Sequence, residues 1–448
     1  MTKTTKEAQI NVITRDGEEE NHRVLDKLDK LIATFHLPKT FVLFALRETI
    51  DSPFSRSVNK MKIVGFIPVR GGSKSIPMKN IKNLLGRPLL FWMLDELLEV
   101  TDDVYVYTDS EQIREKVTSA YTEVTSVHLM DRPTDTATDT ASSESALLDF
   151  CRKVECDIVV FGQATSPLVE AKFINRGIEM TSQGYDSIAS VVRQRRFVWG
   201  IDMGGNGVAK NYDPLNRPRR QDFDGYLVEN GAFYISRRID ILNTNCRISG
   251  KIGLVEMPEE TYFEIDEPSD WCIAEELLRL RLRKNKTWSK IKTLVLDIDG
   301  VFTDAGMYYN DSGEAMKKFN TKDGMALQIA RENGIEIAII TGEKHNINTR
   351  RMEKLKVNQL FQGVTDKYHV LKKIARNKET SLCNIAYVGD DINDVTCLLG
   401  AGLSFAPADS EEKAKANADI VLNRRGGYGA VREAVEKIIK YNNRNRED

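Results

Sequence analysis

Four short stretches in the second half of the chain carry side chains that could do chemistry, and three of them adjoin apolar runs of strand length. Asp297 and Asp299 follow one run, Thr341 ends another, Asp390 follows a third, and Lys367 comes after a polar stretch. A carboxylate nucleophile, a hydroxyl, a cation and carboxylates that bind Mg²⁺ are the parts of a phosphoryl-transfer site. One Asp-x-Asp is a weak signal, but the four stretches in this order predict such a site.

A glycine-rich basic loop follows the first apolar run, residues 62–69. Its candidate phosphate-binding residues are Arg70, Gly71, Gly72, Ser73, Lys74, Lys79 and Asn80. Glycines let backbone N–H groups approach an anion, and basic side chains stabilise charge on a leaving pyrophosphate, so the loop suits a triphosphate. We therefore take Arg70 and Lys79 as candidate catalytic residues. The spacing fits neither a Walker loop nor GxGxxG, and a Gly-Gly pair alone is equally compatible with a turn that binds nothing.

An acidic pair, Glu264 and Asp266, stands near the end of the first half. Carboxylate oxygens are ligands that Mg²⁺ prefers, and side chains two apart on a strand face the same side. The pair is a candidate metal site with Asp266 as the main ligand. Taken alone, a solvated turn is the better interpretation of two acids in a loop.

Two alternations of strands and helices position these residues. In the first half the expected strands are 62–69, 104–108, 157–161, 187–192 and 232–235, and the expected helices are 89–100, 143–153 and 271–284. In the second half the expected strands are 293–298, 335–340 and 384–388, and the expected helices are 324–333, 346–356 and 391–399. Buried strands that alternate with helices predict parallel sheets covered on both faces, hence two three-layer α/β domains.

The predicted organisation has three parts. Residues 1–60 form an extension in which Leu25–Phe35 has helical spacing, residues 61–284 form the first domain and residues 288–448 form the second. Lys284–Lys286 is the expected linker. A length of 448 residues is too great for one core.

The composition is that of a soluble globular protein, with 41% hydrophobic and 29% charged residues. The net charge of −2 provides no basic field for nucleic acid. No apolar run reaches the roughly 18 to 20 residues that span a bilayer. The polar start lacks the apolar stretch of a signal peptide. Six cysteines without CxxC spacing favour reduced thiols in a cytoplasmic protein.

The string Ile67–Asn80 strongly resembles the nucleotide-binding signature of the CMP-sialic acid synthetases. Further matching stretches follow in order, at 106–110, 132–143, 163–168, 186–191, 217–222, 229–234 and 264–270. The resemblance covers about residues 62–284. It implies a Rossmann-like nucleotidyltransferase domain that transfers CMP from CTP to a nonulosonic acid with Mg²⁺, and it favours Asp266 and Glu264 as metal ligands.

The same resemblance assigns further site residues. It adds Asp109 to the nucleotide-binding set and implies that Gln163, Arg220, Gln221 and Tyr234 bind the sugar. Arg219–Arg220 is also similar to a cluster that serves nuclear import in vertebrate relatives, so a nuclear location is open for an animal-type relative. The chain departs from the family pattern at Ala164, Val169 and Glu264, which leaves the sugar and the second metal ligand open.

Residues 290–440 resemble the haloacid dehalogenase superfamily, and specifically its capless 3-deoxy-octulosonate 8-phosphate phosphatases. The resemblance implies that Asp297 is the nucleophile and Asp299 the general acid/base, and that Thr341 and Lys367 bind phosphate. It also implies a Mg²⁺ site formed by Asp297, the Asp299 carbonyl and Asp390, with Asp394 in support. The expected hairpin at 307–314 builds a tetramer in those phosphatases, so we expect a homotetramer formed through the second domain.

These observations predict a cytidylyltransferase that acts on CTP and a sialic acid, with a second domain that hydrolyses the sugar 9-phosphate. The second domain carries Glu343, Lys344 and His345 where the phosphatases usually have an arginine, so a purely tetramerising module is one alternative. A 3-deoxy-octulosonate cytidylyltransferase with its own phosphatase is another. A non-catalytic nucleotide-sugar-binding scaffold is a third.

Overall fold

The computed structural model describes residues 61–137, 142–287, 289–311 and 313–444. Residues Lys62–Asp448 form one compact unit, which contains two large sheets. The helix expected near Leu25–Phe35 lies outside the described residues. Among the helices that the structure describes, none is long and apolar enough to cross a membrane.

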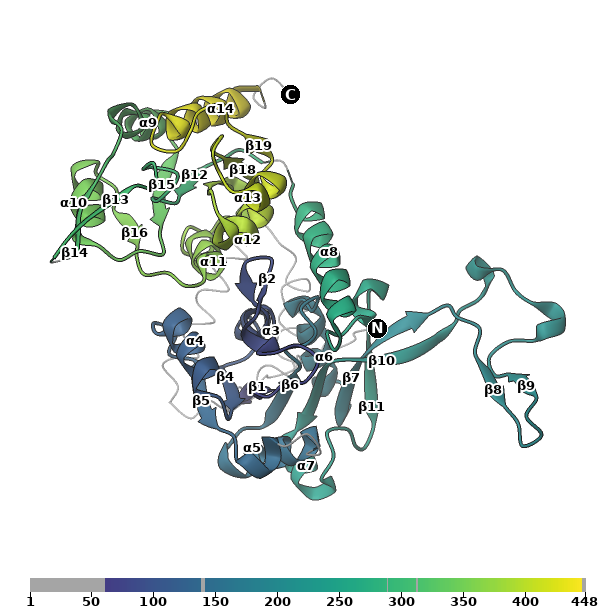
Figure 1. The fold of residues 1–448 in the computed structure, drawn as a ribbon. Helices are drawn as coiled ribbons and strands as arrows, with labels where there is room; N and C mark the ends of the chain where they lie inside the picture. The colour runs from purple at the N-terminus through teal and green to yellow at the C-terminus, as the bar shows by residue number, and fades with distance from the viewer. Residues whose placement is uncertain (1–60, 138–141, 288, 312, 445–448) are drawn as a thin grey trace, which may run out of the picture. The chain divides into compact units, whose positions relative to one another are not determined.

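The first sheet has seven strands in the order β11-β7-β10-β6-β1-β4-β5 (Figure 1). They are β1 (Ile63–Val69), β4 (Asp103–Thr108), β5 (Val127–Asp131), β6 (Ile158–Gly162), β7 (Ser187–Gln194), β10 (Tyr226–Arg237) and β11 (Ile252–Met257). The central strand β1 is a continuous apolar run and is almost wholly buried, as expected for a strand covered on both faces.

Helices cover both faces of this sheet, which confirms the three-layer expectation. They are α3 (Leu89–Leu98), α4 (Glu111–Tyr121), α5 (Ser143–Lys153), α6 (Ala171–Ser182) and α7 (Arg238–Thr244). Ile67 and Val69 pack in one core cluster with α3, α4 and α6, whereas Val64 and Phe66 pack in another with α5 and α7. Alternate side chains of β1 therefore supply opposite faces of the sheet.

Strand β10 corrects the expectation of a parallel first sheet, because it pairs antiparallel with both β6 and β7. The other pairs of this sheet are parallel. A parallel return needs a crossover, usually a helix. The segment between β7 and β10 contains instead the short strands β8 (Trp199–Ile201) and β9 (Gly207–Ala209) and the 3₁₀ turns η4 (Pro214–Asn216) and η5 (Arg220–Asp222). Figure 1 shows the β8–β9 hairpin standing away from the sheet.

The second sheet is parallel throughout, in the order β16-β15-β12-β17-β18-β19. Its strands are β12 (Thr293–Leu296), β15 (Glu336–Ile340), β16 (Gln359–Phe361), β17 (Ile385–Val388), β18 (Leu403–Ala406) and β19 (Ile420–Val421). Leu294 and Leu296 pack with α9 (Thr321–Glu332) and α14 (Ala430–Arg444). Val295 packs with α11 (Lys367–Asn377) and α12 (Val395–Gly400) on the other face.

Three smaller elements complete the second half. They are α10 (Asn346–Lys354), α13 (Glu412–Asn417) and the antiparallel hairpin of β13 (Met307–Asn310) and β14 (Gly313–Lys317). The hairpin lies where the sequence predicted one. The expected helix at 391–399 begins as the 3₁₀ turn η8 (Ile392–Asp394) and continues as α12.

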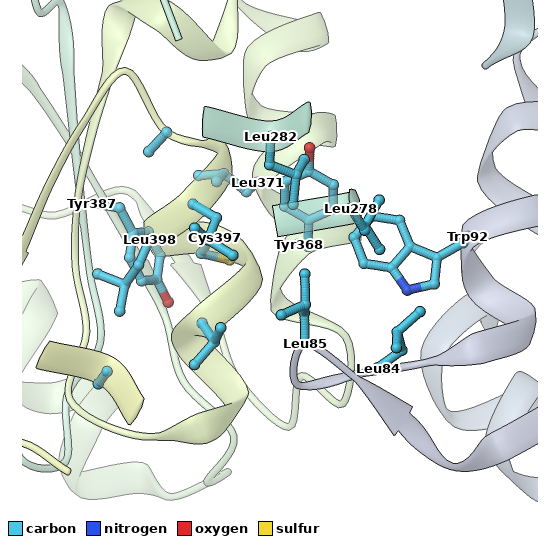
Figure 2. Close-up of a cluster of buried hydrophobic side chains, with 14 of the residues drawn as sticks. Leu84, Leu85, Trp92, Leu278, Leu282, Tyr368, Leu371, Tyr387, Cys397 and Leu398 are labelled. Carbon is cyan, nitrogen blue, oxygen red and sulfur yellow. The ribbon is translucent and has the colours of Figure 1, made fainter. Parts of the chain in front are cut away.

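A single hydrophobic cluster joins the two halves (Figure 2). Leu84, Leu85 and Trp92 come from the first half, specifically from β2 (Asn83–Leu84), the turn that follows it towards β3 (Arg87–Pro88), and α3. The helix α8 (Pro268–Lys284) contributes Leu278 and Leu282, and α11 and α12 supply the facing side chains. Because these apolar side chains are buried together, the two halves share one core in addition to their own.

Candidate active sites

The predicted phosphoryl-transfer site, called the second site, lies at the carboxyl edge of the parallel sheet of the second half, where ligands bind in open α/β folds. Asp297 follows β12, Thr341 follows β15 and Gly389–Asp390 follows β17, and these strands are neighbours. Asp297, Asp390 and Asp394 each offer an oxygen within 4.8 Å of the others. The structure thus brings together carboxylates that lie almost a hundred positions apart in the chain.

Lys367 lies among these carboxylates, at the first position of α11. Its Nζ donates to Asp297 Oδ2 at 2.7 Å and to Asp394 Oδ1 at 2.8 Å, and all three side chains are buried. Burial alone would lower the pKa of Lys367, but the two carboxylates raise it, so the amine is a cation. One fixed cation beside a buried carboxylate is suited to binding a phosphate dianion.

The three carboxylates carry more negative charge than one lysine can balance. Burial, with Asp394 nearby, raises the pKa of Asp297 to about 7, and burial with Asp394 and Asp297 nearby raises that of Asp390 to about 8. Asp390 Oδ1 is buried without a hydrogen-bond partner. A Cβ on Gly300 would lie 1.9 Å from Asp390 Oδ2, so the backbone makes room for this carboxylate. This donor set fits a divalent cation, which prefers oxygen ligands.

Asp394 is more central than the sequence indicated. In addition to Lys367, it accepts a hydrogen bond from the Tyr387 hydroxyl at 2.6 Å and from the backbone N–H of Asp390 at 3.0 Å. It therefore fixes the loop that presents Asp390. Tyr387 was not among the predicted site residues, because a tyrosine within an apolar strand is normally interpreted as a residue of the hydrophobic core.

Asp299 lies outside the group of three carboxylates. Both of its side-chain oxygens accept from Lys317 Nζ at 2.8 Å, and Lys317 is a buried residue of β14. The metal contact expected from the Asp299 carbonyl stays a prediction. Lys317 was missed by the sequence analysis, and no spacing in the Lys317–Lys318 pair distinguishes it from an exposed lysine.

The predicted nucleotide-binding site of the first half, called the first site, is built around the loop after β1. The backbone N–H of Gly71 donates to Asp109 Oδ1 at 3.0 Å, which joins the ends of the neighbouring strands β1 and β4. A Cβ at Gly71 would lie 2.9 Å from the Ser110 Cβ, whereas nothing lies within 4 Å of the Cβ position of Gly72. Gly72 and Lys74 are exposed, so this part of the loop is open to a ligand.

The rest of the predicted nucleotide-binding set lies close by in the chain but differs in burial. Asn80 is buried, and its Nδ2 donates to the Arg70 carbonyl at 3.1 Å. That contact indicates that Asn80 holds the loop in shape. Arg70 and Ser73 are half-buried beside it.

Lys79 connects the basic loop with the acidic pair across 187 positions of sequence. Its Nζ donates to the Ile265 carbonyl at 2.7 Å and to Asp266 Oδ1 at 3.1 Å. Asp266 keeps 69% of its side chain exposed, so it can reach a ligand bound at the loop. The expected pairing of Glu264 and Asp266 on one face of a strand is wrong, because residues 263–267 form no strand.

Glu264 turns instead towards the interior. Burial, with Asp266 nearby, raises its pKa to about 7. Gly231, at φ +64°, accommodates it, since a Cβ there would lie 1.8 Å from Glu264 Oε1. Gln163 Nε2 donates to the Gly231 carbonyl. The predicted sugar residue Gln163 and the predicted metal residue Glu264 thus meet at one glycine.

The remaining predicted sugar residues lie in two places. Tyr234 is buried, and its hydroxyl donates to Glu229 at 3.0 Å. Arg247, which the sequence analysis missed, lies over its ring with Cζ 4.9 Å from the centroid. Arg220 and Gln221 lie on the exposed turn η5, where Arg220 pairs with Glu259 at 3.5 Å. The structure shows no contact that joins the two groups among the residues it describes.

Comparison with known proteins assigns both halves. The family described as cytidylyltransferase matches residues 64–286, and the family described as haloacid dehalogenase-like hydrolase matches residues 356–434. N-acylneuraminate cytidylyltransferase A of Danio rerio is 33% identical over 388 residues, which cover 84% of this chain and 88% of the relative. This chain belongs to the N-acylneuraminate cytidylyltransferase family. The enzyme of Oncorhynchus mykiss is 35% identical over 86% of this chain and 90% of its own length.

The second half of this cytidylyltransferase family member has its own relatives. The 3-deoxy-D-manno-octulosonate 8-phosphate phosphatase KdsC of Escherichia coli K12 is 37% identical over 149 residues, 33% of this chain and 79% of the relative. The solved phosphatase of Moraxella catarrhalis, in complex with magnesium, phosphate and KDO, is 32% identical over 38% of this chain and 93% of its own, with a TM-score of 0.34. The sequence matches confirm both resemblances drawn from the motifs.

Proposed function

We propose that residues 61–284 transfer CMP from CTP to a nonulosonic acid and that residues 288–448 hydrolyse the corresponding sugar 9-phosphate. The observation that carries the first activity is the contact of Lys79 with Asp266, which places a basic phosphate-binding loop beside an exposed carboxylate. The observation that carries the second is the buried Asp297, held by Lys367 in an otherwise acidic group.

In the first reaction a sugar hydroxyl oxygen forms a bond to the α-phosphorus of CTP. The bond from that phosphorus to the bridging oxygen of pyrophosphate breaks, and the hydroxyl proton is released. Negative charge develops on pyrophosphate, where Arg70, Lys74 and Lys79 stabilise it. Gln163 and Tyr234, with Arg220 and Gln221, bind the sugar and its carboxylate.

In the second reaction the Asp297 oxygen attacks the phosphate monoester, and the sugar oxygen leaves with a proton from Asp299. Water then hydrolyses the aspartyl phosphate, returning Asp297 and releasing phosphate. Thr341 and Lys367 bind the phosphate oxygens during both steps. Asp297 and Asp390, with the Asp299 carbonyl and with Asp394 in support, would hold Mg²⁺, which would supply positive charge to neutralise the phosphate.

The metal of the first site has a smaller donor set. Asp266 and Glu264 supply two carboxylates, and the phosphates of CTP supply the further oxygens that Mg²⁺ requires. Asp266 is the stronger candidate because it is exposed, whereas Glu264 is half-buried beside Gly231.

We further propose a cytoplasmic homotetramer assembled through the second half. The β13–β14 hairpin supports this arrangement, because Tyr308, Tyr309 and Met316 on it are more than half exposed. Exposed large side chains on one hairpin are typical of a surface that pairs with another copy. Light scattering of the purified chain measures the assembly directly.

The decisive experiment measures pyrophosphate and phosphate release from the same preparation. The protein receives CTP, Mg²⁺ and either the free nonulosonate or its 9-phosphate. Both products from the 9-phosphate establish the two activities in sequence. Pyrophosphate from the free sugar alone refutes the phosphatase activity and leaves the second half as an assembly module.

Reciprocal variants provide matched controls within one chain. Asp297→Asn removes the nucleophile and is expected to abolish phosphate release while pyrophosphate release from the free sugar continues. Asp266→Asn is expected to do the reverse. A preference for 3-deoxy-octulosonate in substrate competition would refute the nonulosonate assignment.

A further inference from the structure

The turn between β2 and β3 belongs to the first half, but it ends against the catalytic loops of the second. Leu85 lies in the shared core (Figure 2). Its carbonyl accepts a hydrogen bond from the Thr396 hydroxyl at the start of α12. Gly86 has φ +84°, and a Cβ on it would lie 2.1 Å from the Ile392 carbonyl. Ile392 stands between Asp390 and Asp394, so the turn contacts the loop that presents both carboxylates.

Arg87, the next residue along the chain after Gly86, contacts a second segment of the proposed phosphatase site, the start of α11. It is 2% exposed, and its Nε donates to Asp366 Oδ2 at 2.8 Å while Nη2 donates to Asp95 Oδ2 at 2.6 Å. Asp366 is the N-cap of α11, where its side chain accepts from the His369 backbone N–H. The next residue is Lys367, whose amine binds Asp297 and Asp394.

Further contacts hold the same helix on the first half. His369 Nδ1 lies 2.9 Å from Asp95 Oδ1, and Lys372 Nζ lies 2.9 Å from Glu99 Oε1. The N-terminal half of α11 is therefore held by its cap, by Asp95 of α3 and by Glu99, the C-cap residue of α3. A guanidinium bound at two carboxylates is a rigid connection, because its donors have a fixed geometry.

We infer that the β2–β3 hairpin, residues 83–88, is a positioning element of the phosphatase. It holds Lys367 through Arg87 and Asp366, and it holds the Asp390–Asp394 loop through Gly86. The inference rests on the proposed phosphatase function. Hydrolysis in the second half thus depends on a segment of the cytidylyltransferase half. The segment begins only a few residues after Lys79, so one stretch of chain connects the two sites.

Gly86→Ala tests this placement, because the new Cβ must displace the Ile392 carbonyl. Gly184→Ala is the matched control: Gly184 also has φ +84°, but nothing lies within 4 Å of its Cβ position. A displacement of about 1 Å in a catalytic group lowers rate by about 100-fold. We expect Gly86→Ala to lose about that factor in kcat/KM for the sugar 9-phosphate, and Gly184→Ala to keep the wild-type value.

Two readouts separate positioning from a general loss of structure. Pyrophosphate release from CTP and the free sugar, on the same preparations, is expected to stay within about twofold of wild type. The inhibition constant of inorganic phosphate is expected to rise with KM in Gly86→Ala, because Asp394, in the loop that Gly86 contacts, holds the Lys367 amine that binds phosphate. Arg87→Lys is expected to retain more phosphatase activity than Arg87→Ala, since it keeps the charge at Asp366.

Thr396→Val covers the case in which Gly86→Ala does not fold, because it removes only the hydroxyl bound to Leu85. It is expected to lower phosphatase kcat/KM by about threefold to tenfold and to leave pyrophosphate release unchanged. Wild-type phosphatase kinetics in both Gly86→Ala and Thr396→Val would overturn the positioning inference but would leave the proposed phosphatase function intact. Equal losses of both activities would also overturn it, and a wild-type chain that releases no phosphate would refute the phosphatase function itself.

Discussion

Replacement of Gly231 by alanine tests the geometry of the first site most directly. Gly231 adopts φ +64°, and its Cβ position lies 1.8 Å from Glu264 Oε1 and 2.8 Å from Gln163 Nε2. The left-handed conformation costs an alanine about 1–2 kcal/mol. Overpacking a buried site adds about 1–3 kcal/mol, so the expected total loss in the free energy of unfolding is about 2–5 kcal/mol.

Gly184→Ala isolates the conformational part of this cost. Gly184 has φ +84° with nothing within 4 Å of the Cβ position, so the expected loss there is about 1–2 kcal/mol. The double variant Gly231→Ala with Glu264→Ala removes the atoms that the new Cβ would strike. It is expected to recover most of the overpacking cost, since only the contact with Gln163 Nε2 remains, and the recovery appears as a coupling energy of about 1–3 kcal/mol between the two positions.

The assay is urea unfolding of Gly231→Ala, Gly184→Ala, the single variant Glu264→Ala and the double variant, together with pyrophosphate release from CTP and the free sugar. Gly231→Ala is expected to lower kcat/KM for pyrophosphate release by about 100-fold, because it displaces both Gln163 and Glu264. Phosphate release from the sugar 9-phosphate is expected to change little. A stability loss equal to that of Gly184→Ala, or a coupling energy below about 0.5 kcal/mol, would refute the assigned contact.

Three further predictions follow from other contacts. Lys317→Met removes the cation that binds Asp299, and it is expected to lower phosphatase kcat about tenfold or more without changing pyrophosphate release. Lys322→Met, at an exposed position of α9, is the control. Equal phosphatase rates in the two variants would refute a role of Lys317 in the reaction. Burial alone would raise the pKa of Asp95, but Arg87, Lys372 and His369 hold it well below its usual range. The ionised Asp95 carboxylate therefore stabilises the fold at pH values above the unfolded pKa of about 3.9. This stabilisation is lost as the pH falls through the lower pKa of Asp95 in the folded state. Asp95→Asn is expected to cost about 3–5 kcal/mol near neutral pH, and its Tm difference from wild type should shrink below about pH 4; a difference independent of pH would contradict this. EDTA is expected to abolish phosphate release, and added Mg²⁺ to restore it and raise Tm through binding to the folded state. Asp390→Asn should lose the Tm increase, and an unchanged increase would exclude Asp390 as a ligand.

The candidate sites were predictable to the extent that they lie at strand ends. The apolar run before Asp297 and the one before Gly389 each predict a buried strand, and neighbouring parallel strands bring their carboxyl ends to one edge. The glycines after β1 likewise predict an anion-binding loop without reference to the rest of the chain. Local composition is enough in these cases because the backbone geometry of each element is local.

The direction of β10 was not predictable from its own residues. An apolar run of strand length is compatible with either direction, and the choice depends on the connection that precedes it. The wrong prediction that Glu264 and Asp266 share one face of a strand has the same origin. The residue type of Glu264 suits a metal ligand, but its side chain lies beside Gly231, where the absence of a Cβ leaves space for it. Both outcomes depend on packing against segments distant in the chain.

The sequence by itself determined the two α/β halves, the residue types at both sites and the family to which the chain belongs. Only the tertiary structure decided which charges meet. Lys317 pairs with Asp299, and Arg87 with Asp366 across 279 positions, although neither lysine nor arginine stands in a recognisable pattern. Such contacts depend on distances of a few ångströms, and those distances are set by how the elements pack and not by the periodicity within them.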